Sequence, residues 1–93
     1  MNETIRSWMQ AHEADVRALA QEIFHTPELA EQEVQSADAL CRFIQAQDFC
    51  VERGIAGLPT AFKAVYGSGA PVIAFLAEYD ALPELGQEPV PYR

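Results

Sequence analysis

The sequence predicts an α/β fold in which two helices precede three strands of an incomplete sheet. Apolar residues recur at helical spacing in the first half of the chain, and three shorter β-prone runs follow. The last run is continuously apolar, as expected of a strand buried on both faces of a sheet. Because helices that cover such a sheet are typical of α/β layers, we expect one domain over residues 1 to 93.

The first helix is expected over residues 3 to 24. Asn2 can cap its first turn, and Pro27 ends it, because the residue before a proline avoids the helical region. Its apolar face carries Ile5, Trp8, Met9, Val16, Leu19, Ala20, Ile23 and Phe24. We expect this face to bury Trp8, Leu19 and Ile23 against the sheet.

The second helix and the strands follow from the same periodicity argument. A second helix is expected to follow the run of acids at residues 28 to 33 and to end near residues 47 to 48. Its apolar face is formed by Val34, Ala37, Leu40, Cys41 and Ile44. Strands are expected at residues 49 to 53, 60 to 66 and 72 to 76, with a glycine-containing loop at 54 to 59. The segment Gly86 to Arg93 is expected to be irregular.

Composition excludes several classes of function. Fourteen acidic residues against six basic ones give a net charge of −8, so a nucleic acid would be repelled. No apolar stretch reaches the roughly 18 to 20 residues that span a bilayer. The first residues do not resemble a signal peptide, so a cytoplasmic location is expected. Cys41 and Cys50 lack metal-site spacing, and buried free thiols are expected in a reducing compartment.

A candidate site lies at the end of the last predicted strand. Glu78 and Asp80 follow the apolar run at positions i and i+2, so both side chains face the same way if the chain stays extended. Ligands of open α/β sheets bind beyond the carboxyl ends of strands. Paired carboxylates there can ligate a metal, orient a ligating histidine, or exchange protons. A solvated acidic loop without function fits the same spacing.

Three motifs in series resemble those of a metal-dependent amidohydrolase and metallopeptidase family. They are I-F-H-T-P-E-L at residues 23 to 29, G-I-A-G-L-P-T at 54 to 60, and Y-G-S-G-A-P-V-I-A-F-L-A-E-Y-D-A-L-P-E-L-G at 66 to 86. The family includes aminobenzoyl-glutamate hydrolases, N-acyl-amino-acid and auxin-conjugate amidohydrolases and, more distantly, carboxypeptidase G and aminoacylase. The third motif is most similar to the aminobenzoyl-glutamate hydrolase branch.

This resemblance implies a fold, a reaction and roles for three residues. The chain would be the N-terminal part of a zinc-aminopeptidase-like catalytic domain that hydrolyses the amide bond of an N-acyl amino acid or short peptide, using two divalent metals, zinc or manganese. Asp80 matches an aspartate behind the metal centre that orients a ligand or solvent. Glu78 matches an acidic position in the substrate loop that is not a ligand, and Pro83 shapes the turn that leaves the site.

The family motifs that follow are absent from residues 1 to 93. These are the H-x-C-G-H motif, the Glu-Glu pair, later histidines and a lid domain that dimerises. We therefore expect that the chain holds no metal, is inactive alone, and associates with itself through an exposed sheet edge. Three interpretations remain: a segment of a metal-dependent amidohydrolase, a catalytically inactive remnant or proteolytic core, and an unrelated acidic interaction module, which the three ordered motifs disfavour.

Overall fold

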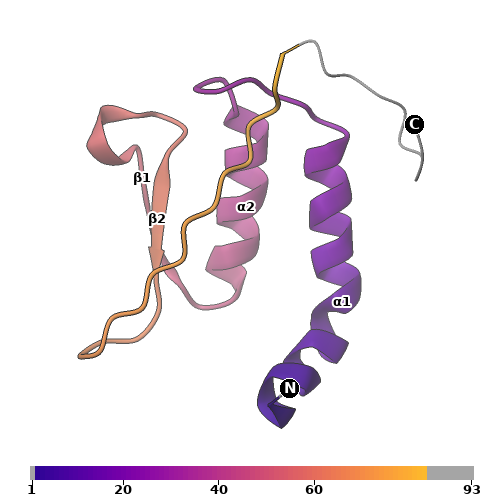
Figure 1. Cartoon of the computed structure of the whole chain (residues 1–93), viewed down its shortest axis with the longest axis vertical. Helices are drawn as coiled ribbons and strands as arrows, with labels where there is room; N and C mark the ends of the chain where they lie inside the picture. Colours follow the sequence, from indigo (N-terminus) through magenta and orange to yellow (C-terminus); the bar gives the residue numbers. More distant parts are fainter. Residues whose placement is uncertain (1, 84–93) are drawn as a thin grey trace.

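The computed structural model describes residues 2 to 83 of the chain. The elements in order are α1 (Glu3–Phe24), α2 (Val34–Ala46), β1 (Cys50–Arg53), a short 3-10 turn η1 (Ile55–Gly57) and β2 (Phe62–Val65). Figure 1 shows α2 between α1 on one side and the β1–β2 pair on the other. The predicted order of two helices followed by an incomplete sheet is confirmed. The expected irregular segment from Gly86 to Arg93 lies outside the described residues.

Helix α1 begins and ends where the sequence predicts. The Asn2 Oδ1 atom accepts a 2.7 Å hydrogen bond from the backbone N–H of Thr4, which satisfies one of the free donors of the first turn. His25 follows the last helical residue, and its N–H donates to the carbonyl of Gln21 at 2.9 Å. Shortly after it, Pro27 prevents the helix from continuing.

The expected packing of α1 against the sheet is wrong. No residue of α1 is buried within the described part of the chain, and Trp8 remains 39% exposed, whereas Leu19 and Ile23 are half-buried. The reason is positional, since α2 lies between α1 and the strands (Figure 1). An apolar helical face identifies a surface that packs, but it does not identify the neighbour.

Helix α2 is the central element of the fold. It packs against α1 and against both strands, and it supplies the buried residues Ser36, Ala37, Ala39 and Cys41. Small side chains at these positions let neighbouring backbones approach closely. Ion pairs join α2 to both sides: Arg42 to Glu22 of α1 at 3.2 Å, and Asp38 to Arg53 of β1 at 2.5 Å.

Strands β1 and β2 form an antiparallel hairpin. Cys50 pairs with Val65 at one end and Arg53 with Phe62 at the other. The connecting loop contains Gly54 at φ +68° and Gly57 at φ +74°, a backbone region that glycine enters without steric cost. The predicted glycine-containing loop therefore lies between the two strands, and its two glycines have conformations that favour glycine.

The prediction of a third strand at residues 72 to 76 is wrong. This segment is not a strand, and its apolar side chains are largely exposed, from 77% for Ile73 to 100% for Leu76. It runs back along the molecule from the end of β2 to the loop between α1 and α2 (Figure 1). A strand needs a hydrogen-bonded neighbour as well as β-prone residues, and no described segment pairs with residues 72 to 76. Apolar composition alone could not reveal this.

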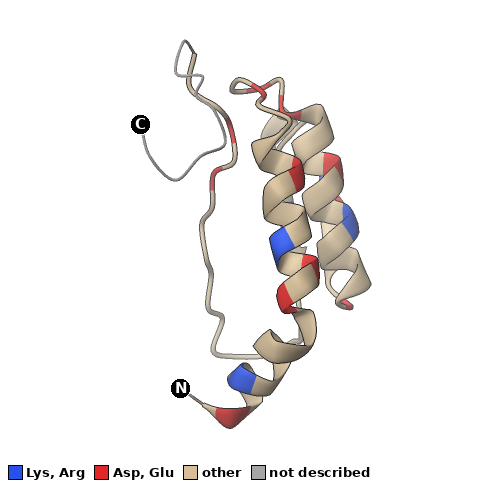
Figure 2. Cartoon of the chain, turned by 90° about the vertical axis from the view of Figure 1, so that its right-hand side faces the viewer, with Lys and Arg blue, Asp and Glu red and all other residues tan. Residues whose placement is uncertain are grey.

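Acidic residues are distributed over most of the elements of the chain. Figure 2 shows acidic positions on both helices, on the loop that connects them and along the C-terminal segment. Basic positions are fewer, in keeping with the net charge of −8. Among residues 2 to 83, neither helix combines the length and the apolar character that crossing a bilayer requires.

Candidate functional site

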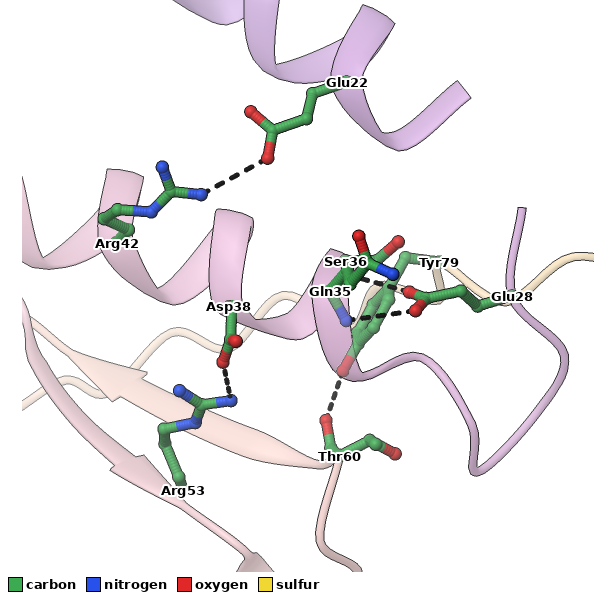
Figure 3. A network of polar contacts seen from close by, with 9 residues as sticks. All are labelled: Glu22, Glu28, Gln35, Ser36, Asp38, Arg42, Arg53, Thr60 and Tyr79. Carbon is green, nitrogen blue, oxygen red and sulfur yellow. Dashed lines mark hydrogen bonds and ion pairs between the residues drawn. The ribbon is translucent and has the colours of Figure 1, made fainter. Parts of the chain in front are cut away.

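Residues from the three sequence motifs meet at one end of α2. The amide of Ala81 donates a 2.7 Å hydrogen bond to the backbone carbonyl of Glu28. Leu29 and Ala81 form an isolated parallel bridge. The hydroxyl of Tyr79 donates to the backbone carbonyl of Thr60, as Figure 3 shows. The loop after α1, the loop before β2 and the segment that carries Glu78 and Asp80, called the acidic segment below, are thus held together.

Tyr79 attaches the acidic segment to the loop that precedes β2. Its ring is half-buried, with a centroid 6.2 Å from that of Phe62, and its hydroxyl donates to Thr60. Burial raises the pKa of the Tyr79 phenol, and the negative charge of Glu33 adds to this effect. The hydroxyl therefore remains a protonated donor over the physiological pH range.

Glu28 attaches the same segment to α2 through two different groups. Its backbone carbonyl accepts from Ala81, whereas its carboxylate accepts from the backbone N–H of Ser36 at 2.8 Å and from that of Gln35 at 3.1 Å. The hydrogen bond from the Ser36 N–H lowers the pKa of Glu28. A carboxylate at a helix N-terminus supplies acceptors for free N–H groups and interacts favourably with the helix dipole.

Thr60 links the loop before β2 to the approach of α2. It is buried, with 8% of its surface exposed, and its hydroxyl donates to the Glu33 carboxylate at 3.4 Å. Thr60 therefore receives Tyr79 at its carbonyl and reaches Glu33 with its side chain. Glu33 directly precedes α2, so both ends of this chain of contacts converge on the start of that helix.

The three predicted site residues lie at the surface beside these contacts. Glu78, Asp80 and Pro83 are all exposed, whereas Tyr79 between the two acids is half-buried. This alternation is that of an extended chain, in which neighbouring side chains face opposite ways. The structure therefore places Glu78 and Asp80 on the same stretch of exposed chain, next to the residues that make the anchoring contacts.

Other chemically active side chains do not join this stretch. Among residues 2 to 83, no three His, Cys, Asp or Glu side chains gather closely enough to hold a metal ion. His12 stacks on Trp8 of its own helix, with ring centroids 4.1 Å apart, and its Nδ1 lies 2.9 Å from the Trp8 carbonyl oxygen. The candidate site therefore consists of the acidic segment and of the residues that hold it in place, Glu28, Thr60 and Tyr79.

The cysteines fit the sequence expectation in part. Cys41 and Cys50 are both free thiols, as expected. Cys41 is buried, and burial raises the pKa of its thiol. The expected burial of Cys50 is wrong, because this residue begins β1 at the margin of a two-stranded sheet and is exposed.

Sequence reasoning did not single out Tyr79, Thr60 or Glu28. One signal for Tyr79 was present: if Glu78 and Asp80 face solvent in an extended chain, the aromatic residue between them must face the protein. A signal for Glu28 was the run of acids at residues 28 to 33 before α2, since negative charge suits a helix start. No local pattern reveals that Thr60 accepts a hydrogen bond at its carbonyl, because that contact joins segments 19 residues apart.

Comparisons with known proteins address the resemblance. Over 91 residues, the chain is 40% identical to one of the subunits of the Escherichia coli p-aminobenzoyl-glutamate hydrolase, a match that covers 95% of the chain. Over 79 residues it is 39% identical to the Xaa-Arg dipeptidase of Mus musculus, covering 74% of the chain. The chain matches a segment of an amidohydrolase and peptidase family. The family resemblance that the motifs predict is thereby confirmed.

Both relatives are much longer than this chain. The chain spans 19% of the length of the bacterial hydrolase and 18% of the length of the mouse dipeptidase. No protein-family model matches the chain. The similarity therefore covers one segment of these longer relatives.

Proposed function

We propose that this chain is the N-terminal segment of a cytoplasmic, metal-dependent amidohydrolase that cleaves the amide bond of an N-acyl amino acid or a short peptide. A p-aminobenzoyl-glutamate-like compound is the proposed substrate, because the bacterial relative carries that substrate in its name and matches nearly the whole chain. A reducing compartment agrees with two free thiols in one small chain.

One structural observation supports a functional role for the acidic segment. Residues of all three family-like motifs contact one another at Glu28, Thr60 and Tyr79. The segment with Glu78 and Asp80 is attached there, although the preceding residues make little contact with the protein. We propose that Asp80 acts in the site by orienting a neighbouring group, and that Glu78 and Pro83 shape the loop that faces the substrate.

The described residues do not by themselves fit a metal centre. A stable site for zinc uses three or four protein ligands, whereas the acidic segment offers two exposed carboxylates. The proposal therefore assigns the ligands of the two divalent metals, zinc or manganese, to parts of the protein other than residues 2 to 83.

A chimera tests the proposed function. The matching segment of the bacterial hydrolase would be replaced by residues 1 to 93 of this chain, and release of p-aminobenzoate from p-aminobenzoyl-glutamate would be measured. We expect the chimera to retain activity and Asp80→Asn to reduce kcat at least about a hundredfold, because a misplaced reacting group costs that much.

The control substitution in the chimera is Asp15→Asn. Asp15 is an exposed acid of α1, so this variant removes the same charge from another element. It should retain the kcat of the unsubstituted chimera. An Asp80→Asn chimera as active as the Asp15→Asn chimera would refute the role of Asp80. An inactive unsubstituted chimera that is folded would refute the proposed function itself.

A further inference from the structure

We propose that Tyr79 and Glu28 are positioning residues that fix Asp80 in the substrate-facing loop. Each of them provides one of two contacts, called the anchor pair, that hold the chain on the two sides of Asp80. Tyr79 precedes Asp80 and donates to Thr60, and Ala81 follows Asp80 and donates to the carbonyl of Glu28. The inference deepens the proposed function and rests on it for the role of Asp80. It assigns no direct contact with substrate to Tyr79 or Glu28.

The residues that precede the acidic segment make little contact with the protein, so the anchor pair determines where Asp80 lies. Val72, Ile73, Phe75 and Leu76 are between 77% and 100% exposed. Within residues 2 to 83, the hydrogen bonds that hold the segment after residue 70 are those of Tyr79 and Ala81. The position of Asp80 therefore depends on two contacts made by its immediate neighbours, and loss of either leaves one attachment point.

The orientation of Tyr79 identifies it as a support. Its hydroxyl is engaged by the Thr60 carbonyl, and its half-buried ring lies beside Phe62. Glu78 and Asp80 on either side are exposed. Since consecutive side chains of an extended chain point to opposite sides, the phenol faces the protein while both carboxylates face away from it. A group placed this way acts through the backbone that it holds.

Glu28 gives the second contact its rigidity. A free loop carbonyl would be a mobile acceptor for Ala81, but the Glu28 carboxylate is itself bound to the N-terminus of α2 by two backbone N–H groups (Figure 3). The carbonyl and the carboxylate of one residue thus connect the acidic segment to the central helix. Helix α2 is the most buried element, so it is a firm base.

The first test measures how firmly the acidic segment is attached in the 93-residue chain, and it requires no enzymatic activity. Amide hydrogen exchange of Ala81 would be followed in the unsubstituted chain, in Tyr79→Phe and in the control Tyr66→Phe. Tyr66 is 70% exposed, and both substitutions remove one hydroxyl and keep the ring. We expect Tyr79→Phe to accelerate exchange of the Ala81 amide about fivefold, the effect of one lost hydrogen bond, and Tyr66→Phe to leave it unchanged.

The second test uses the chimera described above and separates positioning from general destabilisation. Tyr79→Phe should lower kcat about tenfold and leave KM within about twofold, because the reacting geometry is loosened while the binding surface remains. In the background of Asp80→Asn, Tyr79→Phe should cause no further loss, since a support has no effect once the group that it positions is gone.

The outcomes of the two tests are distinguishable. Unchanged Ala81 exchange in Tyr79→Phe overturns the anchor, whatever the chimera does. Losses from Tyr79→Phe and Asp80→Asn that multiply would also overturn it, because the two residues would then act independently. An inactive unsubstituted chimera refutes the proposed function, while the exchange experiment still decides whether Tyr79 holds the segment.

Discussion

Glu28 accepts a 2.7 Å hydrogen bond from the amide of Ala81, which is distant in sequence, while its own carboxylate binds the first turn of α2. One residue therefore serves two segments. Because the carboxylate must be ionised to accept from both N–H groups at full strength, the arrangement depends on pH.

The first prediction concerns acid stability. The pKa of Glu28 is lowered from its ordinary value of 4.5 by the Ser36 N–H, so its contribution to folding is present above pH 4.5. That contribution is lost as the pH falls through the lowered pKa of the folded state. Glu28→Gln should therefore lower the melting temperature at pH 7 and make a smaller difference at the acid end of this window.

The control for this prediction is Glu31→Gln. Glu31 is an exposed acid of the same loop, and its replacement removes the same charge. Thermal melts followed by circular dichroism at pH 7 and about pH 3 would give both differences, well above and below the ordinary carboxyl range. Equal melting temperatures of the Glu28→Gln and Glu31→Gln chains at pH 7 would contradict a special role for Glu28.

A second prediction distinguishes the two thiols. Burial raises the pKa of Cys41, which reduces its thiolate fraction, and the same burial blocks reagents, whereas Cys50 is exposed. We expect one fast-reacting thiol per native chain, at least about tenfold faster than the other. Cys50→Ser should abolish the fast phase with a chromogenic disulfide, and Cys41→Ser should preserve it. Two equally fast thiols in the native chain would show that Cys41 is accessible.

The fold was predictable wherever local signals dominate. Residues 3 to 24 carry a cap, a long apolar face and a terminating proline, and α1 has those bounds. The hairpin follows two β-prone runs around a glycine-containing loop. The prediction of a strand at residues 72 to 76 was wrong because a strand requires a hydrogen-bonded partner, and the presence of a partner is a property of the whole fold.

The candidate site was predictable only in part. Glu78 and Asp80 follow an apolar run, and their exposure agrees with their placement at a surface loop. The contacts that hold this loop involve a backbone carbonyl at Thr60 and another at Glu28, and backbone acceptors leave no mark in a sequence.

A third prediction concerns Asp48, which follows α2. Its φ of +68° lies in the left-handed region, where a side chain costs energy and glycine does not. Asp48→Gly should stabilise the chain by about 0.5 to 1 kcal/mol. Asp15→Gly, in the middle of α1, removes the same charge but should cost about 0.3 kcal/mol, because glycine is somewhat less favourable than aspartate in a helix interior. Urea unfolding would measure both values, and a shared sign would contradict the argument.

A fourth prediction is that the isolated chain is inactive. The purified 93-residue protein should hydrolyse neither N-acyl amino acids nor p-aminobenzoyl-glutamate, and it should retain less than stoichiometric zinc after dialysis. Two exposed carboxylates, Glu78 and Asp80, are too few for a stable zinc site. Tight 1:1 zinc in elemental analysis, lost on Asp80→Ala but kept in Asp15→Ala, would contradict this expectation.

The last prediction concerns self-association, and the structure changes its basis. Residues 72 to 76 were expected to form a buried strand, but they present Val72, Ile73, Phe75 and Leu76 to solvent. An extended apolar segment with unpaired backbone groups can pair with another chain. The net charge of −8 opposes association, yet salt screens such repulsion beyond about 8 Å at physiological ionic strength. We therefore expect a dimer or larger species.

Light scattering over a range of micromolar concentrations measures this directly. The mass should exceed the 10.3 kDa of one chain and rise with concentration. Phe75→Glu places a charge in the middle of the apolar segment and should restore the single-chain mass, because burying that charge between chains would be costly. Ile5→Glu, on the exposed face of α1, adds the same charge elsewhere and should leave the association intact. If Ile5→Glu dissociates the species and Phe75→Glu does not, the chains associate through α1 and the extended segment is not the interface.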